Sequence, residues 1–142
     1  MSATVTPASS PSASSLPASS LAGPSTATVV CDYDRLTPEL GVAALVGGEQ
    51  VALFRLADGS VHAVQNLDPF SGAHVISRGI TGDRAGVPTV ASPIYKQVFS
   101  LVDGTCLVTM DKQPTSGMSA DLEVYPVTLD NGQVIIDLAG RA

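Results

Sequence analysis

Short runs of apolar and β-branched residues recur along the chain from about residue 26, and turn dipeptides separate them. This pattern predicts β-strands, because a strand buries alternate side chains and ends where glycine, asparagine or aspartate permits a tight turn. The expected strands cover residues 26–33, 42–46, 50–56, 61–65, 98–102, 105–108, 122–129 and 134–138. In the last of these, Val134, Ile136 and Leu138 are predicted to share one face.

Three of the breaks between expected strands are Asx-Gly pairs, at residues 58–59, 103–104 and 131–132. Such pairs between β-type runs predict hairpins with type I′ turns, which require positive φ at both central residues. Helical periodicity is confined to two short stretches, residues 37–40 and 72–77. The expected fold is therefore all-β, a small antiparallel β-sandwich or partial barrel built from hairpins.

Two stretches depart from this rhythm of strands. In residues 1–28, Ser, Ala, Thr and Pro supply 23 of the 28 positions and no side chain is charged, which is typical of a disordered tail. Residues 66–97 are predicted to be mostly irregular chain, and a loop of this length in a compact domain usually has a function. We therefore divide the chain into a tail (1–28) and a folded domain (29–142) with a loop subdomain at about 66–99.

Composition excludes several classes of function. The formal charge of -6 argues against a nucleic-acid-binding protein, which needs a basic face, and no apolar run reaches the 18 residues of a membrane-spanning helix. The only cysteines, Cys31 and Cys106, are too far apart in sequence for a CxxC redox pair and too few for an all-cysteine metal site. Neither a nucleophile–base constellation nor a glycine-rich phosphate loop is present, so we expect no catalytic residue in this chain.

Two loops carry a more specific pattern. The first loop (residues 66–73) reads Asn-Leu-Asp-Pro-Phe-Ser-Gly-Ala, and the second loop (residues 91–99) reads Ala-Ser-Pro-Ile-Tyr-Lys-Gln-Val-Phe. They resemble the two cluster-binding loops of Rieske iron–sulfur proteins, whose patterns are Cys-Pro-His-x-Gly-Ala and Cys-Pro-x-His-Gly-x-x-Phe. The prolines, the Gly-Ala pair and the final phenylalanine are retained, and so is the hairpin that follows. The resemblance implies a Rieske-like fold.

All four ligand positions of that pattern are changed, to Asp68, Phe70, Ser92 and Tyr95. A Rieske [2Fe–2S] cluster needs two thiolates and two imidazoles, whereas Phe70 offers no lone pair at all. We therefore expect no metal and no cofactor on this chain. Instead, Phe70 and Tyr95 are predicted to fill the space of the cluster, and Asp68 and Ser92 to accept hydrogen bonds from loop amides.

Further residues narrow the resemblance. Asn66 to Phe70, Ser77-Arg78-Gly79-Ile80 and Ser92 to Gln97 are similar to the small subunits of NAD(P)H-dependent nitrite reductases, over about residues 29–138. This resemblance implies a cluster-free, non-catalytic subunit of a cytoplasmic oxidoreductase that converts nitrite to ammonia in nitrogen assimilation. Its partner would be the large subunit, which carries FAD, a [4Fe–4S] cluster and sirohaem and binds NAD(P)H.

Two other interpretations stay open at this point. The chain could be a cluster-free Rieske-like module that binds another oxidoreductase, such as a degenerate ferredoxin component of an oxygenase. Alternatively, it could carry electrons on a metal held by Asp68, His74 and Tyr95. For the partner interface we predict Arg78, Arg84 and Lys96, three of the seven basic residues. Alternatively, these three positive side chains could bind an anion such as nitrite.

Overall fold

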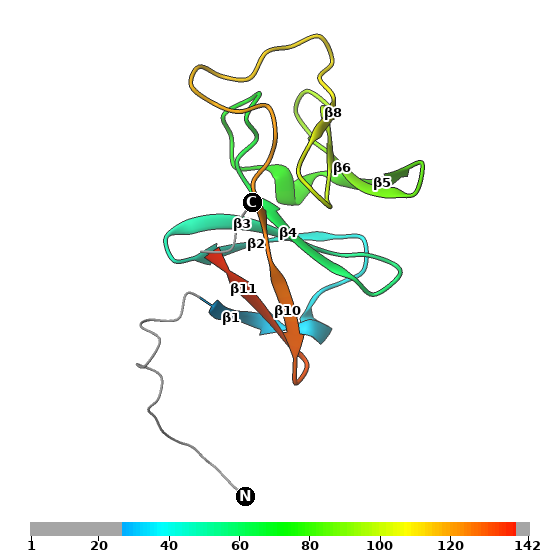
Figure 1. The fold of residues 1–142 in the computed structure, drawn as a ribbon, viewed down its shortest axis with the longest axis vertical. Helices are drawn as coiled ribbons and strands as arrows, with labels where there is room; N and C mark the ends of the chain where they lie inside the picture. The colour runs from blue at the N-terminus through cyan, green and yellow to red at the C-terminus, as the bar shows by residue number, and fades with distance from the viewer. Residues whose placement is uncertain (1–26, 139–142) are drawn as a thin grey trace, which may run out of the picture.

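The computed structural model describes residues 27–138, so the predicted tail lies outside the described residues except for its last two positions. Eleven strands form three antiparallel sheets in this part of the chain (Figure 1). One sheet has the order β1–β11–β10, formed by Ala27–Asp32, Gln133–Asp137 and Val127–Asp130. A second has the order β2–β3–β4–β9, formed by Gly41–Val46, Glu49–Arg55, Val61–Gln65 and Val124–Tyr125. The third has the order β5–β6–β7–β8, formed by Ile80–Arg84, Val87–Ala91, Val98–Ser100 and Cys106–Val108.

The first two sheets form the base of the molecule, with one apolar core between them. Val134 and Ile136 of β11 are buried in this core against Leu53 of β3, while Gln133 is exposed, as the alternation in the sequence predicts. The expected all-β fold is confirmed.

Strand β3 is buried on both faces, because it lies between two cores. Val51 and Leu53 belong to the core of the base, and Ala52 and Phe54 belong to a second core beneath the third sheet. A continuous apolar run is the pattern expected of a strand that is covered on both sides.

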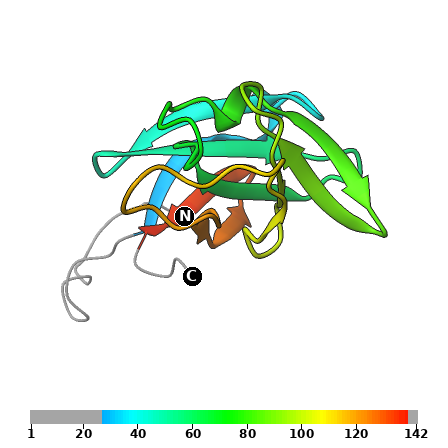
Figure 2. The same ribbon diagram turned by 90° about the horizontal axis from the view of Figure 1, so that it is seen from above.

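The third sheet corrects one prediction. Residues 66–97 were expected to be mostly irregular, but β5 and β6 pair there as a hairpin that projects to one side of the base (Figures 1 and 2). Its turn residues are Ala85 and Gly86, at φ 52° and 88°. A left-handed alanine is uncommon, so the sequence carries no Asx-Gly pair to reveal this hairpin.

The predicted type I′ turns are right at one place and wrong at two. Asn131 and Gly132 both have positive φ, 53° and 74°, as this turn requires. At the other two pairs only the glycine, Gly59 or Gly104, has positive φ. There the aspartate accepts a hydrogen bond from the amide two residues on, at 2.9 Å from Ser60 and 3.0 Å from Thr105, so an Asx-turn replaces the predicted geometry.

The short helices are also placed differently from the prediction. Residues 37–40 are not helical; Glu39 has a φ of 68°, and the nearest helical turn is the 3-10 helix η2 (Tyr33–Arg35). The second predicted helix overlaps the 3-10 helix η3 (Ile76–Arg78) only at its end. The strand expected at residues 122–129 is split into β9 and β10 at Pro126, because proline has no amide hydrogen to donate to a ladder.

Candidate functional site

The first loop leaves β4 and is closed by the buried side chain of Asn66. Its Nδ2 donates to the carbonyl oxygen of His74 at 3.2 Å, and its Oδ1 accepts a hydrogen bond from the amide of Ser77 at 2.8 Å. Asn66 Nδ2 also donates to Gln50 Oε1 at 3.1 Å, which ties the loop to β3. The asparagine therefore fixes both ends of the first loop and the start of η3.

Asp68 and Ser92 join the two loops directly. Both side chains are fully buried, and the Ser92 hydroxyl donates to Asp68 Oδ2 at 2.6 Å. Asp68 Oδ1 accepts from the amide of Phe70 at 2.9 Å, and Ser92 Oγ accepts from the amide of Ile94 at 3.3 Å. The predicted hydrogen bonds from loop amides are confirmed. The bond between the loops was not foreseen, because nothing in the sequence shows that these two side chains touch.

Phe70 fills the space behind this hydrogen bond. Its ring is 5 % exposed, and its centroid lies 6.2 Å from that of Phe99, with a tilt of 52° between the planes. Tilted ring pairs at this separation are favourable. The two rings belong to the core beneath the third sheet, with Phe54, Ile76, Val90, Leu101 and Leu122. Phe70 is therefore a core residue, as predicted.

Tyr95 does not fill this space, which corrects the prediction made for it. The side chain is 41 % exposed, and Lys112 Nζ lies 4.5 Å from the centroid of its ring. Phe70 and Phe99 already fill the core behind the loops, so the Tyr95 ring lies at the surface. The two aromatic residues at former histidine positions thus have different roles.

Gln97 is a buried residue of the second loop to which the sequence analysis gave no role. Its carbonyl oxygen accepts a hydrogen bond from the amide of Ser92 at 2.9 Å, and its Nε2 donates to the carbonyl oxygen of Thr109 at 3.3 Å. Gln97 therefore ties the second loop to the segment after β8. A polar side chain between the loop and an apolar strand was the only signal that the sequence offered.

The segment after β8 (residues 109–118) crosses from the second loop to the first and was also missed. It arches over the end of the molecule opposite β1 and β10 (Figure 1). At its far end, the amide and Oγ1 of Thr115 both donate to the carbonyl oxygen of Pro69, at 2.7 and 3.1 Å. This segment lacks strand periodicity, so only the tertiary contacts reveal its place.

The three predicted interface residues, Arg78, Arg84 and Lys96, are all exposed. Arg78 ends η3 and Lys96 lies in the second loop, near the base of the β5–β6 hairpin. Arg84 pairs with Val87 at the other end of that hairpin, four residues along β5 from Ile80 and therefore about 13 Å away.

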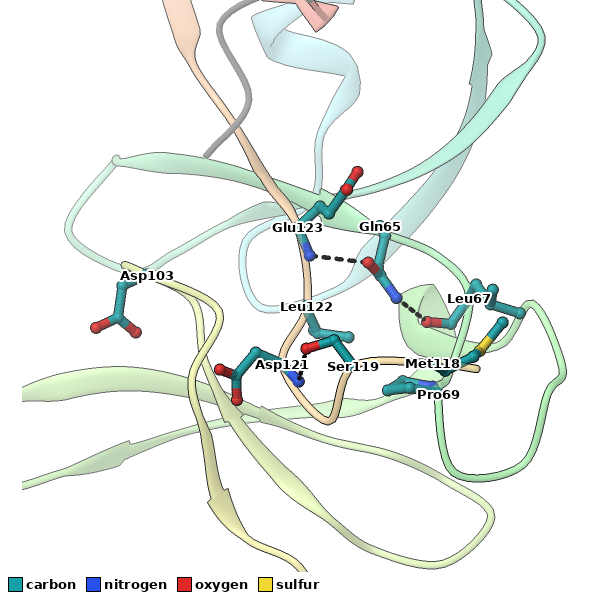
Figure 3. A pocket seen from close by; sticks show the side chains of 9 residues that line it. All are labelled: Gln65, Leu67, Pro69, Asp103, Met118, Ser119, Asp121, Leu122 and Glu123. Atoms are coloured by element: carbon teal, nitrogen blue, oxygen red, sulfur yellow. Dashed lines mark hydrogen bonds between the residues drawn. The ribbon is translucent and has the colours of Figure 1, made fainter. Parts of the chain in front are cut away.

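A hollow of about 490 Å³ lies between the first loop, the turn at Asp103 and residues 118–123 (Figure 3). Gln65 crosses one side of it, accepting from the amide of Glu123 and donating to the carbonyl oxygen of Leu67, both at 2.8 Å. The Asp103 carboxylate accepts a hydrogen bond from the amide of Thr105, and the Asp121 carboxylate accepts one from the amide of Cys106. The hydrogen bonds from Thr105 lower the pKa of Asp103. On this side of the hollow, Gln65 therefore joins the end of β4 to the first loop and to the chain before β9.

The donor set of the two loops does not fit a [2Fe–2S] cluster. Asp68 and Ser92 are hydrogen-bonded to each other, Phe70 has no lone pair, and Tyr95 is on the surface. Burial raises the pKa of both cysteine thiols, Cys31 and Cys106, so neither offers a ready thiolate.

The alternative metal site also lacks support in the geometry. Asp68 is buried, whereas His74 lines another hollow with Leu45, Gln50 and Tyr125. Among residues 27–138, no group of three or more His, Cys, Asp and Glu side chains could hold a metal ion.

Comparisons with known proteins give one consistent result. Residues 27–137 match the family described as the Rieske-like [2Fe-2S] domain. A crystal structure of a protein assigned as the NADH-dependent nitrite reductase small subunit of Mycobacterium tuberculosis is 52 % identical, with a TM-score of 0.67. The match covers 78 % of this chain and 92 % of that one.

Two curated relatives extend this result. The nitrite reductase (NADH) small subunit of Salmonella typhimurium is 48 % identical over 79 residues, which are 55 % of this chain and 73 % of that protein. The nitrite reductase [NAD(P)H] large subunit of Klebsiella oxytoca is 42 % identical over 105 residues; this is 74 % of this chain and only 10 % of that protein.

Within the described residues, the structure contains no helix that is long and apolar enough to span a membrane.

Proposed function

The chain belongs to the Rieske-like [2Fe-2S] domain family and, within it, to the nitrite reductase small subunits, and from this membership we propose that it is the small, non-catalytic subunit of an NAD(P)H-dependent nitrite reductase. In this role it binds the large subunit in the cytoplasm and supports the reduction of nitrite to ammonia. FAD, the [4Fe–4S] cluster, sirohaem and the NAD(P)H site are expected on the large subunit.

The observation that carries this proposal is the match to a large subunit. A stretch similar to 105 residues of this chain is part of the Klebsiella oxytoca large subunit, within one polypeptide. The same kind of domain is a separate small subunit in Salmonella typhimurium. A domain that is fused to a protein in one organism and separate in another is expected to contact that protein in both. The large subunit is therefore the partner that we propose.

The closed space between the two loops supports a role without electron transfer. The Asp68–Ser92 hydrogen bond and the Phe70 ring occupy the place where a Rieske protein has its cluster ligands. A chain built in this way contributes contacts rather than a redox centre. We propose that it bears no cofactor of its own.

The test combines purification with an activity assay. The full chain and the nitrite reductase large subunit of the same organism are purified, and NAD(P)H-dependent ammonia formation is measured for the large subunit with and without the chain. We expect a stable complex, higher or longer-lasting activity in that complex, and no stoichiometric iron or sulfide on the isolated chain.

Two results would contradict the proposal. A chain that leaves both the assembly and the activity of the large subunit unchanged is not its subunit. A red-brown chain, with stoichiometric iron and a rhombic paramagnetic signal after reduction, would instead identify an electron carrier.

A further inference from the structure

Three large apolar side chains are exposed where the second loop meets the segment after β8. Ile94 and Tyr95 are 42 % and 41 % exposed, and Met110 is 49 % exposed. The Gln97–Thr109 hydrogen bond and the contact between Lys112 and the Tyr95 ring bring the two segments together. We call Ile94, Tyr95, Lys96, Met110 and Lys112 the Tyr95 patch. Aromatic and methionine side chains are enriched at the centres of protein interfaces.

The backbone of this patch is held in an unfavourable conformation. Lys96, Met110 and Asp111 have φ values of 69°, 58° and 58°, and they are three of the six non-glycine residues with positive φ in residues 27–138. A left-handed conformation is unfavourable for a residue that has a side chain. Two of the other three, Ala85 and Asn131, lie in hairpin turns that require it. Strain of this kind persists where the surrounding structure fixes it, and it concentrates at functional sites.

Hydrogen bonds hold the patch in one geometry. The amide of Lys112 donates to the carbonyl oxygen of Thr109 at 3.2 Å across the Met110–Asp111 turn. Lys96 Nζ donates to the carbonyl oxygen of Pro93 at 2.9 Å. The Tyr95 ring is therefore presented to a partner without much further loss of conformational entropy, which favours affinity.

The fold itself does not need Tyr95 at this position. Phe70 and Phe99 already occupy the core behind the two loops, and Asp68 with Ser92 closes the space between them. The exposure of Tyr95 is consequently available for a contact outside this chain.

The charge of the patch indicates which kind of surface it meets. The whole chain carries a formal charge of -6, but the patch contributes two lysines, with Asp111 as the neighbouring acid. We propose that the Tyr95 patch is the surface that docks on the nitrite reductase large subunit, on a face with an apolar centre and a carboxylate rim. This inference rests on the proposed function, and it names the part of this chain that makes the contact.

The experiment measures the Kd of the full chain for the purified large subunit by calorimetry. Tyr95→Ser and Met110→Ser are each expected to raise the Kd at least about tenfold, as for interface anchors. Lys112→Glu is expected to weaken binding most at low ionic strength, because salt screens exposed charges. Lys96→Gly removes a positive charge from the patch and is also expected to raise the Kd. Glycine suits the left-handed backbone at this position, so the change in Kd would not come from misfolding.

Two matched controls lie elsewhere. Leu45→Ser removes an apolar side chain that is 73 % exposed on β2, in a different sheet. Arg35→Glu reverses the charge of an exposed arginine in η2, between β1 and β2. Both are expected to leave the Kd within about twofold of the unchanged chain, since contacts outside an interface contribute little.

The outcomes separate this inference from the proposed function. If the unchanged chain does not bind the large subunit, the proposed function fails. If it binds and the Tyr95, Met110 and Lys112 variants bind equally well, the docking surface is wrong. Equal weakening by Leu45→Ser or Arg35→Glu would also overturn it. Tyr95→Phe keeps the ring and should bind as the unchanged chain does; loss of binding by Tyr95→Phe would contradict a role for the ring.

Discussion

At the scale of single residues, Phe70 and Tyr95 stand at the two positions where the Rieske pattern has histidine. One of them is a core residue and the other is a surface residue. Phe70 is buried against Phe99, whereas Tyr95 lies under Lys112 at the surface. The sequence predicts that both positions have lost their ligands, because that follows from residue type alone. It does not reveal which ring is buried, since this depends on how much space Phe99 already fills.

The first prediction compares these two rings by alanine substitution. Phe70→Ala should lower the free energy of unfolding by about 3–5 kcal/mol, because it opens a cavity in the core. Tyr95→Ala should lower it by less than about 1 kcal/mol, since it removes only an exposed ring and its cation–π contact. Urea unfolding of the full-length variants measures both values. Equal losses would show that the two rings share the core.

A second prediction concerns the hydrogen bond between the loops. Ser92→Ala leaves one oxygen of the fully buried Asp68 carboxylate without its donor, so the free energy of unfolding should fall by about 1–3 kcal/mol. Asp68→Asn should cost less, because its amide nitrogen can donate to Ser92 Oγ. Chemical denaturation of both variants checks this order. Unchanged stability of Ser92→Ala would mean that the bond contributes nothing.

At the scale of elements, the strands of the base could be predicted from the sequence and those of the third sheet only in part. β11 alternates buried and exposed residues, and β3 is apolar throughout because it separates two cores. β5 has no such pattern, since it is an edge strand whose side chains are mostly exposed. Apolar periodicity cannot reveal a strand that buries little.

Gly41 provides a prediction at this scale, because η3 passes directly over it. A Cβ at this position would lie 2.6 Å from Phe54 Cε1 and closer still to the carbonyl oxygen of Ser77. Gly41→Ala should therefore displace η3 from β2 and cost about 1–3 kcal/mol. Thermal unfolding tests this value.

The matched control is Gly82→Ala, whose Cβ would meet only Thr89 Oγ1 at 3.3 Å. It should be neutral or slightly stabilising, because alanine loses less conformational entropy than glycine when a strand forms. The explanation for Gly41 would be wrong if both alanine variants unfolded at the same temperature.

At the scale of the whole molecule, side chains outside the loops join the base to the third sheet. Glu39 accepts hydrogen bonds from Thr81 Oγ1 in β5 and from the amide of Ala57 beyond β3, both at 2.6 Å. His62 of β4 is half-buried beneath the β5–β6 hairpin, in a hollow that also contains Asp58 and Pro88. The family resemblance predicts this architecture. The particular connecting residues appear only when the sheets are placed together.

His62 makes the stability of the molecule depend on pH. Burial lowers its pKa below the ordinary value of 6.5, while the Leu101 carbonyl oxygen and the Asp58 charge oppose the shift. Since the unfolded chain binds the proton more readily, this contribution to stability is present above about pH 6.5 and is lost as the pH falls below it. When the pH falls from 7.5 to 5.5, the free energy of unfolding measured in urea should decrease less for His62→Gln than for the unchanged chain. Equal losses would exclude His62 as the cause.

The hydrogen bond between Asp68 and Ser92 has a consequence for how the chain reaches its final form in the cell. A Rieske protein reaches its final form only after iron and sulfide have been inserted between its two loops. Here the corresponding space is already occupied by the protein's own side chains when the loops close. We therefore expect this chain to fold to its final form equally well in iron-starved cells, independently of the machinery that assembles clusters.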